Sequence, residues 1–212
     1  MIIAGIMTKN PDFVTPDLSV NDAKALMTRE KIQKLPVLNK NNELVGIVTQ
    51  KELLNAGPSA ATTLDMYEIS YLLSKLKVVN IMNKNVISVQ ETETIEEAAR
   101  IMADNNIGCL PVMKGKLLVG IITESDLFRT FVDLFGARHI GIRVTFSLDE
   151  KPGQLAVLTK AIADKSGNII SLVTSEGDDV SKRRVTCRIA DLDMDSVKAI
   201  YKDLDIKIED IR

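Results

Sequence analysis

The segment Leu44-Val45-Gly46-Ile47-Val48-Thr49 returns later in the chain as Leu118-Val119-Gly120-Ile121-Ile122-Thr123. The motif Leu35-Pro36-Val37 precedes the first copy, and Leu110-Pro111-Val112 precedes the second. The offset is 75 residues for the second pair and 74 for the first, because one residue drops out of the turn between them, and the offset of 75 also lays Ile6-Met7 on Ile81-Met82. Self-similarity at a fixed period marks a repeat architecture. The first two thirds of the chain therefore contain two copies of one structural unit.

Each copy predicts the same order of helix, strand, strand and helix. Apolar residues recur at helical spacing between positions 20 and 27 and again between 95 and 102. Two apolar segments joined by a polar turn then predict a hairpin, and Thr49 or Thr123 opens a further helix. One such unit cannot bury its apolar face alone, so we expect the two to pack as one domain.

The composition limits the classes of function. With 212 residues, 45% of them hydrophobic and 26% charged, the chain is long enough for two globular domains. A net charge of −2 argues against nucleic acid or an anionic membrane as the partner. The start lacks the pattern of a signal peptide, the longest apolar stretch is too short to cross a bilayer, and Cys109 and Cys187 lie in apolar patterns. A cytoplasmic protein with buried, reduced thiols is expected.

The end of each hairpin carries the first chemical signature. Thr123 is followed by Asp126, and Thr49 by Glu52, which places a hydroxyl at a helix N-terminus and an acid nearly one turn later. Such a site suits a phosphate, and the carboxylate can accept hydrogen bonds from two ribose hydroxyls. The alternative is a capping box that needs no ligand. We favour the cap for Thr49 and Glu52, and a ligand for Thr123 and Asp126 because Asp is the poorer capping partner.

These motifs together resemble a tandem pair of cystathionine-β-synthase (CBS) domains, called a Bateman module. The carrying residues are Ile6-Met7-Thr8, Leu35-Pro36-Val37, Gly46-Ile47-Val48-Thr49 and their second-copy counterparts through Asp126. The resemblance implies an adenosine-containing regulatory ligand (AMP, ADP, ATP or S-adenosylmethionine) in clefts between the two units. Residues implied at the first cleft are Thr123, Asp126, Ile6, Asn10, Pro11, Ile32, Gln33 and Gly108. Those at the second are Thr49, Glu52, Val86, Ile107 and Gly108; Glu52 departs from the family's usual Asp, so we expect one occupied site, at Asp126.

A different pattern begins near residue 138. Alternating apolar residues from 140 to 148, a helix after Pro152-Gly153 and a strand after Gly167-Asn168 begin the order β-α-β-β-α-β. That order is a ferredoxin-like sandwich. The motif from Asp149 to Leu155, with Gly167-Asn168-Ile169, resembles an ACT domain, a module that senses amino acids. The resemblance implies a ligand site at Glu150, Pro152, Gly153 and Asn168 at a dimer interface; an ACT fold used only for dimerisation is the alternative.

The sequence as a whole therefore predicts an α+β protein. We expect CBS domains at 1–56 and 78–134, a linker helix at 57–77, and an ACT domain with a ferredoxin-like fold at 138–212. This order resembles the acetoin-utilisation AcuB-type proteins. We expect a homodimeric regulatory sensor of an adenosine-containing ligand, with an amino-acid sensor working through the ACT domain as the alternative.

Several groups of polar residues do not fit a metal or catalytic site. The acids Asp191, Asp193 and Asp195 fail as a calcium loop and fit a helix N-terminus. The single histidine, His139, falls in the hinge between the domains, and Lys182-Arg183-Arg184 fits the solvent face of a strand, with contact to a nucleotide phosphate from a partner subunit as the alternative. We expect no metal, no catalytic cofactor and no enzymatic activity, because no nucleophile–base pair or metal cluster is evident.

Overall fold

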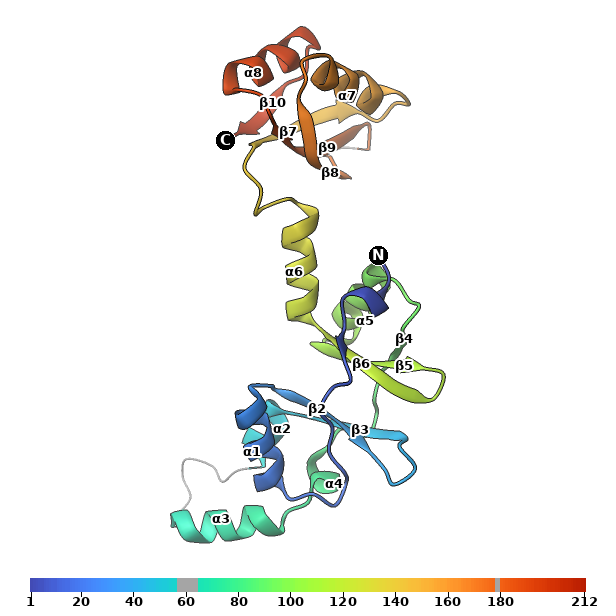
Figure 1. The fold of residues 1–212 in the computed structure, drawn as a ribbon, viewed down its shortest axis with the longest axis vertical. Helices are drawn as coiled ribbons and strands as arrows, with labels where there is room; N and C mark the ends of the chain where they lie inside the picture. The colour runs from blue at the N-terminus through green and yellow to red at the C-terminus, as the bar shows by residue number, and fades with distance from the viewer. Residues whose placement is uncertain (57–64, 178–179) are drawn as a thin grey trace. The chain divides into compact units, whose positions relative to one another are not determined.

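The two copies of the repeated unit fold into the same order of elements, as their sequences predict (Figure 1). The computed structural model describes residues 1–56, 65–177 and 180–212, which divide into two units, Met1–Leu127 and Phe128–Arg212. The first copy consists of α1 (Val20–Glu30), β2 (Lys34–Leu38), β3 (Leu44–Thr49) and α2 (Gln50–Asn55). The second consists of α5 (Ile95–Asn105), β5 (Cys109–Lys114), β6 (Leu117–Thr123) and α6 (Glu124–Leu134).

The first helix of each copy begins and ends in the same way. Ser19 caps α1 by accepting the backbone N–H of Asp22, and Thr94 caps α5 through the N–H of Glu97. Each helix stops at a residue in the left-handed region, Lys31 with φ 56° and Asn106 with φ 52°. Side-chain oxygens at the first cap satisfy N–H groups that the helix cannot. The local sequence therefore sets both boundaries of these helices.

The segment that leads into each copy pairs with the other copy. Strand β1 (Thr8–Lys9) pairs antiparallel with β6, and Asn83 exchanges two backbone hydrogen bonds of 2.9 Å with Ile47 of β3. The paired segments approach each other most closely at Gly120 and Gly46. A Cβ on Gly120 would overlap the side chain of Met7, and a Cβ on Gly46 would overlap that of Met82. The two copies are thus joined by exchanged segments as well as by side-chain packing.

The core of this unit is divided between the copies. One buried cluster centres on Ala23, Leu35 and Val48, and a second on Ala98, Leu110 and Ile122. A smaller cluster of Ile47, Cys109 and Ile121 draws on both copies and lies between them. The sheet of the second copy has the order β1-β6-β5-β4, with β4 (Val89–Gln90) parallel to β5. In the first copy a parallel bridge from Val14 to Val37 takes the place of β4.

The remaining elements of this unit precede or join the repeats. They are a 3-10 helix, η1 (Ile3–Gly5), and two helices, α3 (Met66–Lys75) and α4 (Val78–Ile81). The linker helix expected over 57–77 is present as α3, which lies beside α1, whereas residues 57–64 fall outside the described part of the chain. Both cysteines are buried and unpaired, as expected.

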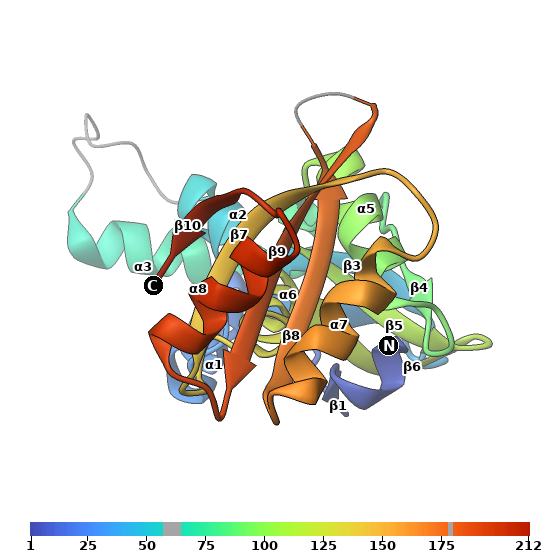
Figure 2. The ribbon, with the colours of Figure 1, turned by 90° about the horizontal axis from the view of Figure 1, so that it is seen from above.

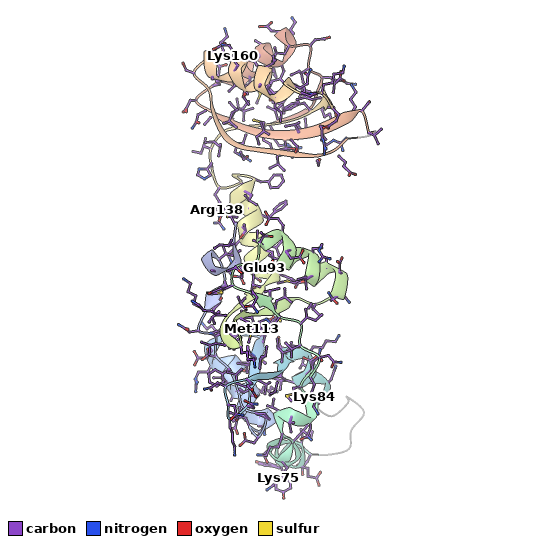
Figure 3. The ribbon with its side chains drawn as sticks, turned by 90° about the vertical axis from the view of Figure 1, so that its right-hand side faces the viewer. Lys75, Lys84, Glu93, Met113, Arg138 and Lys160 are labelled. Atoms are coloured by element: carbon purple, nitrogen blue, oxygen red, sulfur yellow. The ribbon has the colours of Figure 1, made fainter. Side chains whose placement is uncertain are left out.

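The second unit has the predicted β-α-β-β-α-β order. Its elements are β7 (Ile142–Asp149), α7 (Gln154–Asp164), β8 (Asn168–Glu176), β9 (Lys182–Ala190), α8 (Met194–Asp203) and β10 (Ile208–Ile211). The strands form an antiparallel sheet in the order β10-β7-β9-β8, and both helices cover one of its faces (Figure 2). Phe146 and Tyr201 pack edge to face in the core, whereas Lys160 lies on the outer side of α7 (Figure 3).

Three polar features of this unit lie where the sequence places them. Asp193 caps α8 by accepting the N–H of Ser196 at 2.7 Å, which confirms the acids as a helix N-terminus. His139 is exposed in the turn before β7. The basic run lies at the start of β9, where Lys182 and Arg184 pair with Asp149 and Glu209.

Candidate ligand-binding clefts

A cavity of about 640 Å³ lies between the two repeats. Val86, Ile87 and Ile107 contribute apolar walls, and the polar walls come from both copies. All five residues implied at the second cleft line it: Thr49, Glu52, Val86, Ile107 and Gly108. The fold therefore gathers in one place residues that are up to 59 positions apart in the chain, and it does so because Ile47 of β3 pairs with Asn83.

Thr49 and Glu52 form the capping box that the sequence favoured. The Glu52 carboxylate accepts the Thr49 backbone N–H at 2.8 Å and also the Thr49 hydroxyl. The hydroxyl oxygen accepts the N–H of Lys51 at 3.2 Å. These contacts hold both side chains in fixed positions at the edge of the cavity.

Thr123 and Asp126 make the equivalent contacts in the second copy, which corrects one step of the sequence argument. The Asp126 carboxylate accepts the backbone N–H and the hydroxyl of Thr123, both at 2.8 Å, and the residue is only 7% exposed. Asp is thus long enough to cap here, and its identity does not by itself distinguish a ligand role from a cap. The preference for a ligand at Asp126 loses that support.

The other residues implied at the Asp126 cleft are divided among several places. Ile6 packs against the core of the second copy, next to Met7. Asn10 and Pro11 line a cavity of about 400 Å³, and Ile32 and Gln33 line another of about 260 Å³. Gln33 and Gly108 also line the larger cavity with Thr49. The structure therefore brings the residues implied at the Glu52 cleft together in one cavity, whereas those implied at the Asp126 cleft are spread over several places.

Lys34 and Glu124 are cleft residues that the sequence analysis missed. Lys34, on β2, donates from its ammonium to the backbone carbonyl of Gly108, and Glu124 opens α6 beside it. Cys109 lies next to them, and burial raises the pKa of its thiol. The Lys34 ammonium lowers that pKa, whereas the carboxylates of Glu124 and Glu52 raise it further. One feature of the sequence could have indicated Lys34 as a cleft residue. It is a lysine at the start of an apolar strand, and the equivalent position in the other copy is Cys109.

The ACT-like unit has its own cavity, of about 440 Å³, beside the turn between β7 and α7. Glu150 and Gly153 line it, and the exposed Pro152 lies between them in the chain. Charged side chains surround the opening: Arg183 pairs with Glu150, and Asp149 accepts from Lys182 at 2.6 Å and Lys151 at 2.9 Å. These two lysines lower the pKa of Asp149 to about 2.

Asn168 is not brought to this cavity within one chain. It pairs with Ala190 at one end of β9, whereas Asp149 pairs with Lys182 at the other end. At about 3.3 Å per residue the two ends are roughly 26 Å apart. Within one chain Asn168 therefore lies at the opposite end of the sheet from Glu150, Pro152 and Gly153, and the ligand site expected at a dimer interface stays a prediction.

Within 1–56, 65–177 and 180–212, no helix combines the length and apolar character needed to span a bilayer. In the same residues, no three His, Cys, Asp or Glu side chains are grouped as ligands for a metal ion.

Family models match both parts of the chain. The CBS domain matches residues 3–59 and 78–133, and the TTHA0829-like ACT domain matches residues 140–212. Two uncharacterized proteins from Methanocaldococcus jannaschii are similar in sequence. MJ1426 is 30% identical over 62% of this chain and 92% of its own length; MJ1404 is 31% identical over 73% of this chain, which spans only 37% of that longer relative.

Solved structures are similar as well. A Vibrio cholerae structure that carries the acetoin utilization protein (AcuB) name is 33% identical, with a TM-score of 0.54 over 65% of this chain and 95% of that one. The structure of CBSX2 in complex with AMP is 31% identical, with a TM-score of 0.51 over 62% and 96%. The CBS pair of MJ0100, in complex with 5′-methylthioadenosine and S-adenosylmethionine, is 26% identical, with a TM-score of 0.53 over 66% and 98%. The chain belongs to the CBS-domain family, as a tandem CBS pair followed by a C-terminal ACT domain of the TTHA0829-like type.

Proposed function

We propose that this protein is a regulatory sensor that binds an adenosine-containing ligand between its CBS domains. CBS and ACT domains are regulatory modules, and CBS pairs similar to this one bind AMP, or S-adenosylmethionine and 5′-methylthioadenosine. The signal would pass to or through the ACT domain, and the protein would have no catalytic activity of its own.

The observation that carries the proposal is the 640 Å³ cavity between the repeats. Its wall combines apolar side chains with amide and charged groups that come from both copies. A concave site that combines apolar walls with fixed polar groups is the usual form of a small-molecule site. We therefore assign the ligand to the cleft of Thr49, Glu52, Val86, Ile107 and Gly108.

Calorimetric titration with AMP, ADP, ATP and S-adenosylmethionine tests the proposal. We expect at least one of them to bind the full chain, and Gly108→Val to abolish binding because its side chain would fill the cavity wall, where even a Cβ would lie 2.7 Å from Glu124. Asp126→Asn is the matched comparison for the other cleft, and we expect it to leave binding in place. No binding by any of the four compounds would contradict the proposal.

The ACT cavity supports a second candidate, an amino-acid sensor in which the CBS pair is a scaffold. Strand β8 is an edge of the sheet, and edge strands readily pair with a second chain. Antiparallel pairing of two β8 strands would bring Asn168 of the partner subunit towards Thr174, which lines the cavity. A homodimer would thus complete the site that one chain leaves divided.

Two measurements separate this candidate from the first. Light scattering reports whether the chain is a dimer, and a screen of amino acids by thermal shift reports whether the ACT unit binds one. A rise in melting temperature with an amino acid, lost in Asn168→Ala, would favour the amino-acid sensor. If no amino acid changes the melting temperature, the dimerisation role of the ACT unit is favoured instead.

A further inference from the structure

Lys34 and Glu124 meet on the wall of the inter-repeat cavity, one from each copy. The Lys34 ammonium donates to the carbonyl of Gly108, and both charged groups lie over the bare α-carbon of that glycine. A Cβ at Gly108 would be 3.3 Å from Lys34 Nζ and 2.7 Å from Glu124 Oε2. The repeat places Cys109 and Gln50 at the equivalent positions, so these two opposite charges occur on one side only of a nearly symmetric cleft.

The charges that line the cavity balance. Its charged side chains are Lys34, Lys51, Glu52 and Glu124, which sum to zero. A phosphorylated nucleotide would bring two or more negative charges beside Glu52 and Glu124, and like charges in a partly desolvated site repel. A ligand that carries one charge of each sign avoids this cost, and it can use Lys34 and Glu124 together.

We propose that the cleft selects adenosine derivatives that carry a zwitterionic amino-acid group. Glu124 accepts hydrogen bonds from the ammonium of that group, and Lys34 donates to its carboxylate. Both contacts are charge-assisted, and they are stronger than hydrogen bonds between neutral groups. The inference rests on the proposed adenosine site and names the class of ligand that the site takes.

The ligand can bind Lys34 without leaving the half-buried carbonyl of Gly108 unsatisfied. The carbonyl of Gly108 also accepts the backbone N–H of Glu124 at 3.2 Å. When the Lys34 ammonium turns to a carboxylate, that carbonyl keeps one partner, so the usual penalty for an unpaired buried acceptor does not arise. Val86, Ile87 and Ile107 remain as the apolar wall for the uncharged part of the ligand.

Two ligands that differ only in the amino-acid group test the proposal. S-adenosylhomocysteine and 5′-methylthioadenosine share the adenosine and a neutral thioether, and only the first is a zwitterion. With the full chain in a calorimeter, we expect S-adenosylhomocysteine to bind about a hundredfold more tightly than 5′-methylthioadenosine or AMP, because each of the two charge-assisted contacts contributes about tenfold. Lys34→Met and Glu124→Gln should each remove about tenfold of that affinity and leave 5′-methylthioadenosine within about twofold.

Controls separate selectivity from folding. Lys116→Met removes a lysine from the exposed turn between β5 and β6, and it should change neither affinity. Lys34→Arg and Glu124→Asp keep the charges and should keep the preference. Equal binding of the two thioethers to the wild type, tighter binding of AMP, or equal losses for both thioethers in Lys34→Met would overturn the inference while leaving the adenosine site in place. Failure of every adenosine compound to bind would instead reject the proposed function.

Discussion

At the scale of the residue, Gly46 and Gly120 occupy the same place in the two repeats, each beneath a methionine. A Cβ on Gly120 would run into Met7 and lie 3.1 Å from the Thr8 carbonyl, and one on Gly46 would meet Met82 and lie 3.3 Å from the Asn83 carbonyl. We expect Gly120→Ala and Gly46→Ala each to lower the free energy of unfolding by about 1–3 kcal/mol, because overpacking forces neighbours to move. Urea denaturation measures this. Gly5→Ala is the control, since its Cβ would meet nothing within 4 Å; an equal loss there would contradict the explanation.

Asp149 gives a pH-dependent prediction at the same scale. Hydrogen bonds and charge from Lys182 and Lys151 lower its pKa from 3.8 to about 2. A lowered pKa means that the ionised form stabilises the fold above the ordinary value, and that this contribution is lost as the pH falls through about 2. A carbon-detected NMR titration should place the Asp149 midpoint near 2, and Lys182→Met should raise it. A midpoint near 3.8 in the wild type would show that the lysine contacts do not persist in solution.

At the scale of the element, Asp193 is the test of a helix boundary. Its carboxylate caps α8, and the same N–H from Ser196 lowers its pKa. Asp193→Ala should destabilise the protein by about 1 kcal/mol, the usual effect of losing such a cap. Asp195→Ala, in the first turn of α8, should cost less, because it contributes only through the helix dipole. Thermal unfolding followed by circular dichroism measures both, and a larger loss for Asp195→Ala would contradict this assignment.

The elements that the sequence predicted are those whose signal is local. The periodic residues from 20 to 27 gave α1, and the paired apolar runs gave the hairpin of β2 and β3. Strand β1 has only two residues, and its partner β6 is more than a hundred positions away, so no periodicity could indicate it. The same reason applies to the site: Thr49 and Glu52 were found by their spacing, whereas Lys34 and Glu124 meet only through the pairing of the repeats.

At the scale of the whole molecule, the two units have separate cores. The cluster around Phe146 and Tyr201 consists entirely of residues after 141, and the clusters of the CBS pair end before residue 128. Residue-level motifs were enough to identify both families because each motif lies within one unit. The motifs do not distinguish between the two clefts, because Glu52 and Asp126 both accept the backbone N–H of the threonine three residues before them.

Separate cores predict that the full chain unfolds in two calorimetric transitions, one for each unit. A ligand that binds only the folded CBS pair, at a hundred times its dissociation constant, stabilises that unit by about 2.7 kcal/mol. We therefore expect an adenosine compound to raise one transition by on the order of 10 °C. The accompanying shift of the other transition measures the coupling between the units, because allosteric coupling is a free energy shared by both sites. Gly120→Ala identifies the transition of the CBS pair, since it should lower that one alone. A single cooperative transition would show that the units unfold together, and the ligand would then report on the whole chain.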